Sequence, residues 1–380
     1  MYFTIDREVL LENLNTISRG LPSKTPMPIL TGIKMDVTST DLFLTSYNID
    51  LSIQTLITDK SLDVKEVGKT IIPGKFFLDI IRKVNSQKIT LNLIEDKILI
   101  IKADRAEYKL HVMNYLDYPN VDFVNLTNPL VLEAPLLKEV IRQTVFATST
   151  SEKKPILTGV NFVLTKNTLT ATATDSYRIS QTKIDLNNTY NPFNITIPSK
   201  SLDELYKSID NYEDCIELYF AKNSLLFKFK NVLFQTRLLD GNYPDTSKLL
   251  NRSLPTVIKF NKEELLDAVE RVSLLSPRDK EKDKEITYSI IKLMLKLDNS
   301  VEISTTNTQI GDAKEEIIPT NIEALEPLQI GFSARYLVEA LRSFNGSVVS
   351  LNFVDKAKPF IILSETEPNL TELILPIRMD

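Results

Sequence analysis

Apolar side chains recur along this chain at two spacings, one typical of helices and one typical of strands. Near the N-terminus, apolar residues three or four positions apart share one face of a helix: Leu10, Leu14, Ile17 and Leu21. The same spacing predicts amphipathic helices over residues 6–20, 133–148 and 261–275. Alternating or continuous apolar runs, such as residues 98–102 and 168–173, predict β-strands.

Particular residue types mark where these helices begin. Pro135 suits a first helical turn, and Asn261 with Glu264 three residues later resembles a capping box. Shorter second helices are expected over residues 75–84, 200–209 and 335–344, each after a small residue that can cap it: Gly74, Ser199 and Ser333. The order helix, strands, helix, strands lacks regular β-α alternation and predicts an α+β fold with antiparallel sheets.

This order of elements occurs three times, because the sequence itself repeats. The pentapeptide Pro28–Gly32 recurs 127 positions later as Pro155–Gly159, and Tyr118-Pro119 recurs 125 positions later as Tyr243-Pro244. A weaker third copy aligns Leu10, Leu14 and Ile17 with Leu265, Val269 and Val272. After this helix, the number of positions that separates the third copy from the first increases slightly. A solvated loop at the charged run 279–285 explains the increase. We predict three tandem copies of one domain, over residues 1–125, 126–253 and 254–380.

Composition places the chain among soluble globular proteins. Of its 380 residues, 43% are hydrophobic and 25% are charged, and its apolar runs fall short of the roughly 18 residues that a membrane span needs. The N-terminus lacks the basic region, apolar region and cleavage site of a signal peptide. The single cysteine, Cys215, excludes an internal disulfide and fits a reducing compartment. We therefore expect a cytoplasmic protein that has no membrane partner.

Scarce residue types exclude most catalytic chemistry. One histidine, His111, and one cysteine cannot form a zinc site and leave little scope for imidazole catalysis. The tripeptide Gly68-Lys69-Thr70 looks like the end of a phosphate-binding loop, but Asp63 stands where that loop needs glycine. Carboxylates are plentiful, so a site built only from Asp and Glu stays open. We predict no catalytic residue, no metal and no cofactor.

Five sequence strings carry a resemblance to a known family. They are KPILTG at 154–159, ATDSYRI at 173–179, IPSK at 197–200, DGNYPD at 240–245 and LILPIR at 373–378. In their joint order and spacing, over its whole length, the chain resembles the bacterial DNA polymerase III beta subunit, the sliding clamp. The resemblance implies a non-enzymatic processivity factor, a head-to-tail homodimeric ring with sheets outside and helices lining a hole. Duplex DNA would pass through the hole, and the ring would tether the polymerase.

Charge is consistent with a ring that holds DNA loosely. The chain has a net charge of −5, which argues against tight neutralisation of phosphates. The three first helices sum to −3 and the three second helices to +3. The loops after the first helices add basic residues that we expect to contact DNA, of which Lys24 matches a DNA-contacting position of the family: Lys24, Lys153, Lys154 and Arg278.

The resemblance also implies a cleft between the second and third domains. There the polymerase, the clamp loader and repair proteins would insert a short peptide that carries Leu and Phe. The matching positions are Leu157, Thr174, Tyr177, Arg178, Ile179, Pro244, Lys248, Leu249, Tyr288, Ser333, Tyr336, Ile362, Leu375, Pro376, Ile377 and Arg378. The chain departs from the family where Ser176-Tyr177 replaces a frequent Gly-His, where Lys248 replaces Arg, and where Met379-Asp380 extends the C-terminus.

The subunit interface implied by the resemblance pairs a strand of the first domain with a helix end of the third. The matching residues are Tyr108 and Leu110 against Leu274 and Leu275. Two adjacent leucines at a helix end are not easily buried by one helix face, which favours an interface. Two other functions stay open, a three-repeat protein scaffold that never binds DNA and an enzyme with a carboxylate site.

Overall fold

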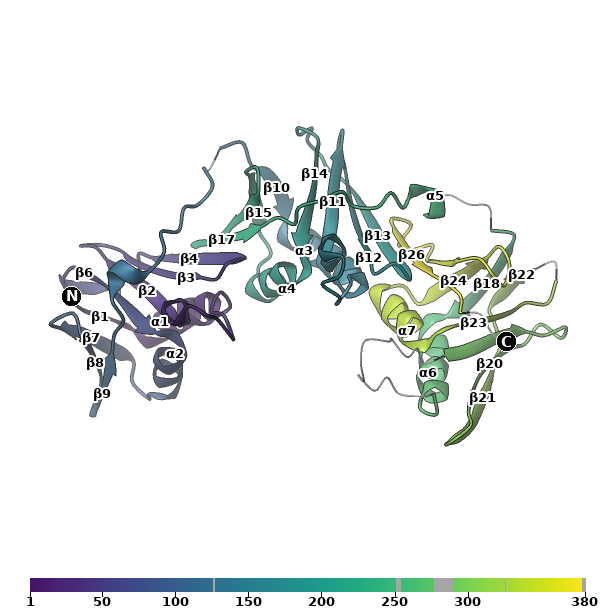
Figure 1. Ribbon diagram of the computed structural model, residues 1–380, viewed down its shortest axis with the longest axis horizontal. Coiled ribbons are helices and arrows are strands. Elements are labelled where there is room, and N and C mark those ends of the chain that lie inside the picture. Colours follow the sequence, from purple (N-terminus) through teal and green to yellow (C-terminus); the bar gives the residue numbers. More distant parts are fainter. Residues whose placement is uncertain (126, 251–253, 277–289, 325, 378–380) are drawn as a thin grey trace. The chain divides into compact units, whose positions relative to one another are not determined.

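The computed structural model describes residues 1–125, 127–250, 254–276, 290–324 and 326–377. Within them the chain forms four antiparallel sheets, and each repeat contributes a first and a second helix (Figure 1). The predicted loop at 279–285 lies outside the described residues. None of the helices in the described ranges is long and apolar enough to cross a membrane.

All six predicted helices are present. The first helices of the repeats are α1 (Arg7–Ser18), α3 (Ala134–Thr144) and α6 (Lys262–Ser273), and the second helices are α2 (Gly74–Lys83), α4 (Ser199–Ser208) and α7 (Ala334–Ser343). A single turn, α5 (Ser247–Leu250), follows the second repeat. Asn261 caps α6, because its side chain accepts hydrogen bonds from the backbone N–H groups of Glu263 and Glu264.

Two of the three expected caps of the second helices are wrong. The helices α2 and α4 begin at Gly74 and Ser199 themselves, so neither residue precedes its helix. Ser333 does occupy the N-cap position of α7 but makes no side-chain hydrogen bond to the helix. Since each of these helices follows directly from a strand, the sheet and the packed face of the helix define the start instead.

The first repeat contributes a five-stranded sheet and half of an eight-stranded one. The five strands, in spatial order, are β5 (Asp63–Glu66), β1 (Tyr2–Asp6), β7 (Lys88–Ile94), β8 (Ile98–Ala103) and β9 (Ala106–His111). The eight are β10 (Leu130–Glu133), β15 (Cys215–Phe220), β16 (Ser224–Phe229), β17 (Val232–Arg237), β4 (Leu51–Ile57), β3 (Leu42–Tyr47), β2 (Gly32–Val37) and β6 (Gly68–Pro73).

The third repeat likewise has one sheet of its own and shares a larger sheet with the second repeat. A nine-stranded sheet runs β14 (Phe193–Pro198), β11 (Gly159–Thr165), β12 (Thr168–Thr174), β13 (Arg178–Asp185), β26 (Leu370–Ile374), β25 (Phe360–Leu363), β24 (Val348–Phe353), β18 (Thr256–Asn261) and β22 (Asn321–Glu323). A four-stranded sheet runs β21 (Gly311–Ile317), β20 (Val301–Asn307), β19 (Ile290–Leu295) and β23 (Gln329–Ser333). In the third repeat α6 packs against α7, as α1 packs against α2 in the first.

The described chain divides into two compact units, residues 1–137 with 200–238, and residues 138–199 with 239–380. Each unit contains one strand pair that joins two repeats. We call the β4–β17 pair of the first unit the first seam, and the β13–β26 pair of the second unit the second seam. Two residues predicted for the partner cleft, Arg178 and Ile179, belong to β13 of the second seam.

Candidate functional site

A small apolar cluster covers one face of the second seam. Ile179 on β13 is paired with Leu373 on β26, and both are buried with Ile361. Partly buried leucines of the linker, of β25 and of the C-terminal segment pack against them: Leu249, Leu250, Leu254, Leu363 and Leu375. We call this group the seam cluster. It brings together three of the predicted cleft residues, Ile179, Leu249 and Leu375.

The sequence reasoning missed Leu373 and Ile361 and chose Ile362 in their place. Side chains on a strand alternate between the two faces of the sheet, so neighbours in β25 point in opposite directions. Ile362 is fully buried in the main core of the third repeat, whereas Ile361 lies in the seam cluster. The structure therefore does not bring Ile362 into the cluster, and strand alternation combined with the register of β26 is the signal that could have found its neighbour.

The turn before β13 is built around a buried arginine. Arg178 is only 4% exposed, and its guanidinium donates to Asp175, to Glu339 on α7 and to the Phe146 carbonyl. The group also lies over the ring of Tyr336, 4.4 Å from its centroid. Arg178 therefore joins the second repeat to α7, and little of its side chain is exposed.

Hydrogen bonds hold the C-terminal segment and the linker next to β13. The Leu375 N–H donates to the Tyr177 carbonyl at 2.9 Å, and the Ile377 N–H donates to the Gly331 carbonyl at 2.7 Å. On the linker side, the Thr174 N–H donates to the Tyr243 hydroxyl at 2.9 Å, and burial raises the pKa of Tyr243. The C-terminal segment and the linker are thus each anchored next to β13.

The other predicted cleft residues differ in exposure. Leu157, Thr174, Ser333 and Tyr336 are buried, Pro376 and Ile377 are half-buried, and Tyr177, Pro244 and Lys248 are exposed. Leu157 lies in the 3₁₀ turn Pro155–Thr158, within the repeated pentapeptide. Tyr288 and Arg378 lie outside the described residues. Tyr177, at 44% exposed, is a large accessible aromatic side chain directly beside the anchored C-terminal segment.

The predicted DNA contacts lie on loops. Lys24 is exposed and precedes the 3₁₀ turn Pro28–Thr31, while Lys153 and Lys154 are exposed and precede the equivalent turn Pro155–Thr158. None of these three lysines forms an ion pair with a residue in the described ranges. Arg278 lies outside those ranges.

The predicted interface residues lie on an edge strand and directly after a helix. Tyr108 and Leu110 belong to β9, an edge strand of the five-stranded sheet, and Tyr108 is 38% exposed. Leu274 directly follows α6 and is 66% exposed, while Leu275 is half-buried. The strand β21 forms a free edge of the four-stranded sheet.

The part of the chain that the structure describes offers no group of three His, Cys, Asp or Glu side chains that could hold a metal ion. Family models then account for nearly the whole chain. Residues 1–122 match the N-terminal domain, residues 131–245 the central domain and residues 248–378 the C-terminal domain of the DNA polymerase III beta subunit. The chain belongs to the DNA polymerase III beta-subunit family.

Individual relatives agree with the family models. The beta sliding clamp of Bacillus subtilis is 35% identical over 385 residues, with both chains covered completely. That of Staphylococcus aureus (strain N315) is 36% identical, covering 100% of this chain and 99% of the relative. The crystal structure of the DNA polymerase sliding clamp from Bacillus subtilis superposes with a TM-score of 0.94 at 34% identity, with full coverage of both chains.

Family membership decides between the functions left open by the sequence. The chain is a DNA sliding clamp, a processivity factor for a DNA polymerase, built from three clamp domains. Members of this family are accessory factors and not catalysts, which excludes the hypothesis of an enzyme with a carboxylate site. A scaffold that never meets DNA is removed as well, because the family acts on DNA.

Proposed function

We propose that two copies of this chain close head to tail into a ring around duplex DNA in the cytoplasm. Each copy would contribute domains over residues 1–125, 126–253 and 254–380. Two free sheet edges support this assembly, β9 in the first repeat and β21 in the third. An exposed edge favours pairing with another strand, and exposed Tyr108 and Leu274 supply apolar surface near those ends.

Within the ring we propose that Lys24, Lys153, Lys154 and Arg278 contact the phosphates. Loop lysines without carboxylate partners are available to an incoming anion, which supports the three described residues in this role. Phosphate contacts carry no sequence information, so the ring would move along any duplex.

Partners would bind at the second seam. The observation that carries this proposal is the seam cluster, a group of apolar side chains at a domain junction, which leucines of the linker, of β25 and of the C-terminal segment border. Apolar pockets with a few orienting polar groups are typical binding sites for peptide side chains. We propose that the catalytic subunit of the polymerase, the clamp loader and other clamp-binding proteins each insert a Leu- and Phe-containing peptide here.

Peptide titration of the variant Ile377→Asp tests this site. Ile377 is half-buried and held by Gly331, so a charge there enters the wall of the cleft without removing a core side chain. A labelled peptide of the type Gln-Leu-x-Leu-Phe should bind the variant at least about tenfold more weakly, since each anchoring side chain is worth about 1.5–3 kcal/mol. The control Ile318→Asp, at an 80% exposed position of the same repeat, should bind normally. Normal binding by Ile377→Asp would show that the pocket lies elsewhere.

A further inference from the structure

The two seams share one strand register but have opposite polarity. In the first seam Ser52 pairs with Gln235 and Ile53 with Phe234; in the second seam, 127 positions further along β13, Ile179 pairs with Leu373 and Ser180 with Glu372. Because side chains alternate between the two faces of a sheet, one pair of each seam faces the helices and the other faces away. The pairs that face the helices are Ile53 with Phe234 and Ser180 with Glu372. At the first seam the helix-facing pair is apolar and the outward pair is polar. At the second seam the helix-facing pair is polar and the outward pair is apolar.

The outward polar pair of the first seam is covered by the chain itself. The Gln235 side chain accepts a hydrogen bond from the Val124 N–H at 2.7 Å and donates to the Asp122 carbonyl at 2.9 Å. These bonds hold the linker after the first repeat on β17. No such clamp exists at the second seam among the described residues, because Leu373 stands at the position of Gln235. The first seam thus holds its linker by hydrogen bonds to a polar side chain, whereas linker leucines pack on the apolar pair of the second seam, which is the seam proposed to bind peptides.

The helix-facing polar pair of the second seam buries a carboxyl group. Glu372 is 2% exposed, and its Oε1 atom lies 2.9 Å from the Ser180 hydroxyl and 3.0 Å from the Ser343 hydroxyl at the end of α7. Each serine also contacts a backbone carbonyl, that of Gln143 on α3 for Ser180 and that of Ala340 for Ser343. Glu372 therefore links β26 to β13 and to both flanking helices.

Hydrogen-bond counting favours a protonated carboxyl group at this position. Ser180 and Ser343 each have one hydroxyl proton, but each hydroxyl makes two contacts, one with a backbone carbonyl and one with Glu372. Two protons thus serve four contacts, and a protonated Glu372 supplies a third proton. Burial raises the pKa of Glu372 well above its usual value, against smaller opposing effects from Ser180, Ser343 and Arg178. The group thus acts as a hydrogen-bonding acid within the seam.

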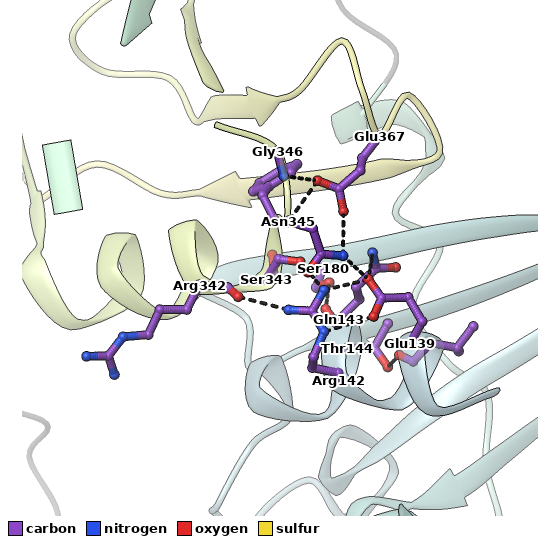
Figure 2. Close-up of polar contacts among 12 residues, drawn as sticks. Glu139, Arg142, Gln143, Thr144, Ser180, Arg342, Ser343, Asn345, Gly346 and Glu367 are labelled. Carbon is purple, nitrogen blue, oxygen red and sulfur yellow. Dashed lines mark hydrogen bonds and ion pairs between the residues drawn. The ribbon is translucent and has the colours of Figure 1, made fainter. Parts of the chain in front are cut away.

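A second layer of polar contacts fixes the same helices to each other (Figure 2). Arg142 on α3 donates to the carbonyl oxygens of Arg342 and Ser343 at 2.9 and 2.8 Å, at the C-terminal end of α7. Glu139 accepts from Arg142 and, at 2.9 Å, from the Asn345 side chain, whose backbone N–H donates to Glu367. The polar side of the second seam is therefore a connected network and not an isolated buried group.

We propose that Glu372 is a positioning residue for partner binding, which sets the register and spacing of the strand pair that carries Ile179 and Leu373. This inference rests on the proposed peptide pocket. Buried polar networks specify one arrangement of a contact more narrowly than apolar packing does, at some cost in stability. The neighbouring residues of the same two strands form the seam cluster, so a shift between β13 and β26 would displace the surface on which the peptide docks.

Two substitutions separate positioning from general stability. Glu372→Gln keeps the shape and the hydrogen-bonding capacity of the side chain, so peptide affinity should stay within about twofold of the wild type. Glu372→Leu removes the polar contacts but leaves both serines their backbone acceptors, so the melting temperature should be retained while the affinity falls about tenfold. As a matched control, Asn161→Leu removes another buried polar side chain from the same sheet, where it bonds to residues 194–196. It should lower the melting temperature and leave the affinity unchanged.

Wild-type affinity in Glu372→Leu would overturn the inference, as would parallel losses of affinity and melting temperature that Gln does not rescue. If Leu prevents folding, Ser343→Ala replaces it, and it should weaken peptide binding without a matching loss of stability. A failure of the pocket itself gives a different result, because Ile377→Asp would then bind peptide normally whatever happens at position 372.

Discussion

Arg178 shows how one residue can shape a binding site while it is hardly accessible. Its positive charge is buried and is balanced by Asp175 and Glu339, with the Phe146 carbonyl and the Tyr336 ring completing its surroundings. Removing one partner of a buried ion pair leaves the other charge without compensation, which costs far more than removing an exposed pair. The residue thus supports the site from inside the turn that presents Tyr177.

Replacing this cation should therefore cost much of the protein's stability. We expect Arg178→Met to lower the free energy of unfolding by about 3–5 kcal/mol, because Asp175, whose side chain is only 12% exposed, loses its cationic partner. Denaturant unfolding measures the loss, and peptide titration should show weaker binding. Arg335→Met is the control, since Arg335 pairs with the same Glu339 but is 60% exposed, and it should cost below about 1 kcal/mol. Equal losses in the two variants would refute this account of Arg178.

Glu372 makes a prediction about pH. Since burial raises its pKa above that of the unfolded chain, the group supports folding fully at low pH and loses that contribution as pH rises through the folded-state pKa. Glu372→Gln cannot ionise, so its stability should exceed that of the wild type increasingly as pH rises, with little difference in acid. Unfolding midpoints of both proteins across about pH 5–9 provide the measurement. Parallel pH profiles would show that the carboxyl group does not titrate there.

At the scale of elements, the sequence predicted helices better than strand faces. Apolar spacing and Asn261 located α6 to within two residues, because a helical stripe and its cap are local properties. Strand faces are harder to predict: the structure places Ile361, and not the predicted Ile362, in the seam cluster. In the run Phe360–Leu363 every residue is apolar, so the pattern does not show which side chains face the helices. Only the pairing of β25 with β26 settles that point.

The role of Glu372 could not be predicted either. In sequence it is one acidic residue among 50 Asp and Glu residues, and the two serines that contact it are distant along the chain. The repeats provided an indirect signal, because Ser180 aligns with buried Ile53. A polar residue at an aligned core position predicts a buried polar partner, but identifying that partner requires the register of the seam.

Loops rather than helices are expected to dominate contact with DNA. Several helix-borne cations are already paired with carboxylates, among them Arg342 with Glu270 at 2.6 Å and Lys207 with Glu204 at 2.7 Å. Phosphates must compete for such cations, whereas the loop residues Lys24, Lys153 and Lys154 have no carboxylate partner among the described residues.

Changing these three lysines to Ala should weaken direct binding to duplex DNA equally for all sequences. The slope of log affinity against log salt should also become shallower by about 0.9 for each phosphate that the variant no longer neutralises. Fluorescence anisotropy at several salt concentrations measures both effects. Lys222→Ala, an exposed lysine in the turn between β15 and β16, serves as the control for net charge. An unchanged slope in the triple variant would place the DNA path elsewhere.

At the scale of the whole molecule, each of the four sheets in the described residues has two edge strands, and β9 and β21 are two of these. The edge strands β9 and β21 belong to the first and the third repeat, and the intermediate junctions are already made by the two seams. Inside the chain, neighbouring repeats are thus joined by antiparallel strand pairs. A second copy would add a pairing of the same kind at β9 and β21. Topological retention on DNA then depends on the contact between copies and not on affinity for phosphate.

Breaking that contact should separate the ring function from folding. Replacing Leu274 and Leu275 with Glu should give a folded monomer, because charges in an apolar contact cost several kcal/mol while each domain keeps its own core. Loaded onto DNA by its clamp loader, the wild type should stay on closed circles through a salt wash and dissociate after linearisation, whereas the variant should dissociate from both. Light scattering reports the oligomeric state. Leu297→Glu with Ile318→Glu, at positions 89% and 80% exposed in the same repeat, provides the matched control and should remain dimeric and retained. A dimeric Leu274 and Leu275 variant that stays on circular DNA would contradict the proposed interface.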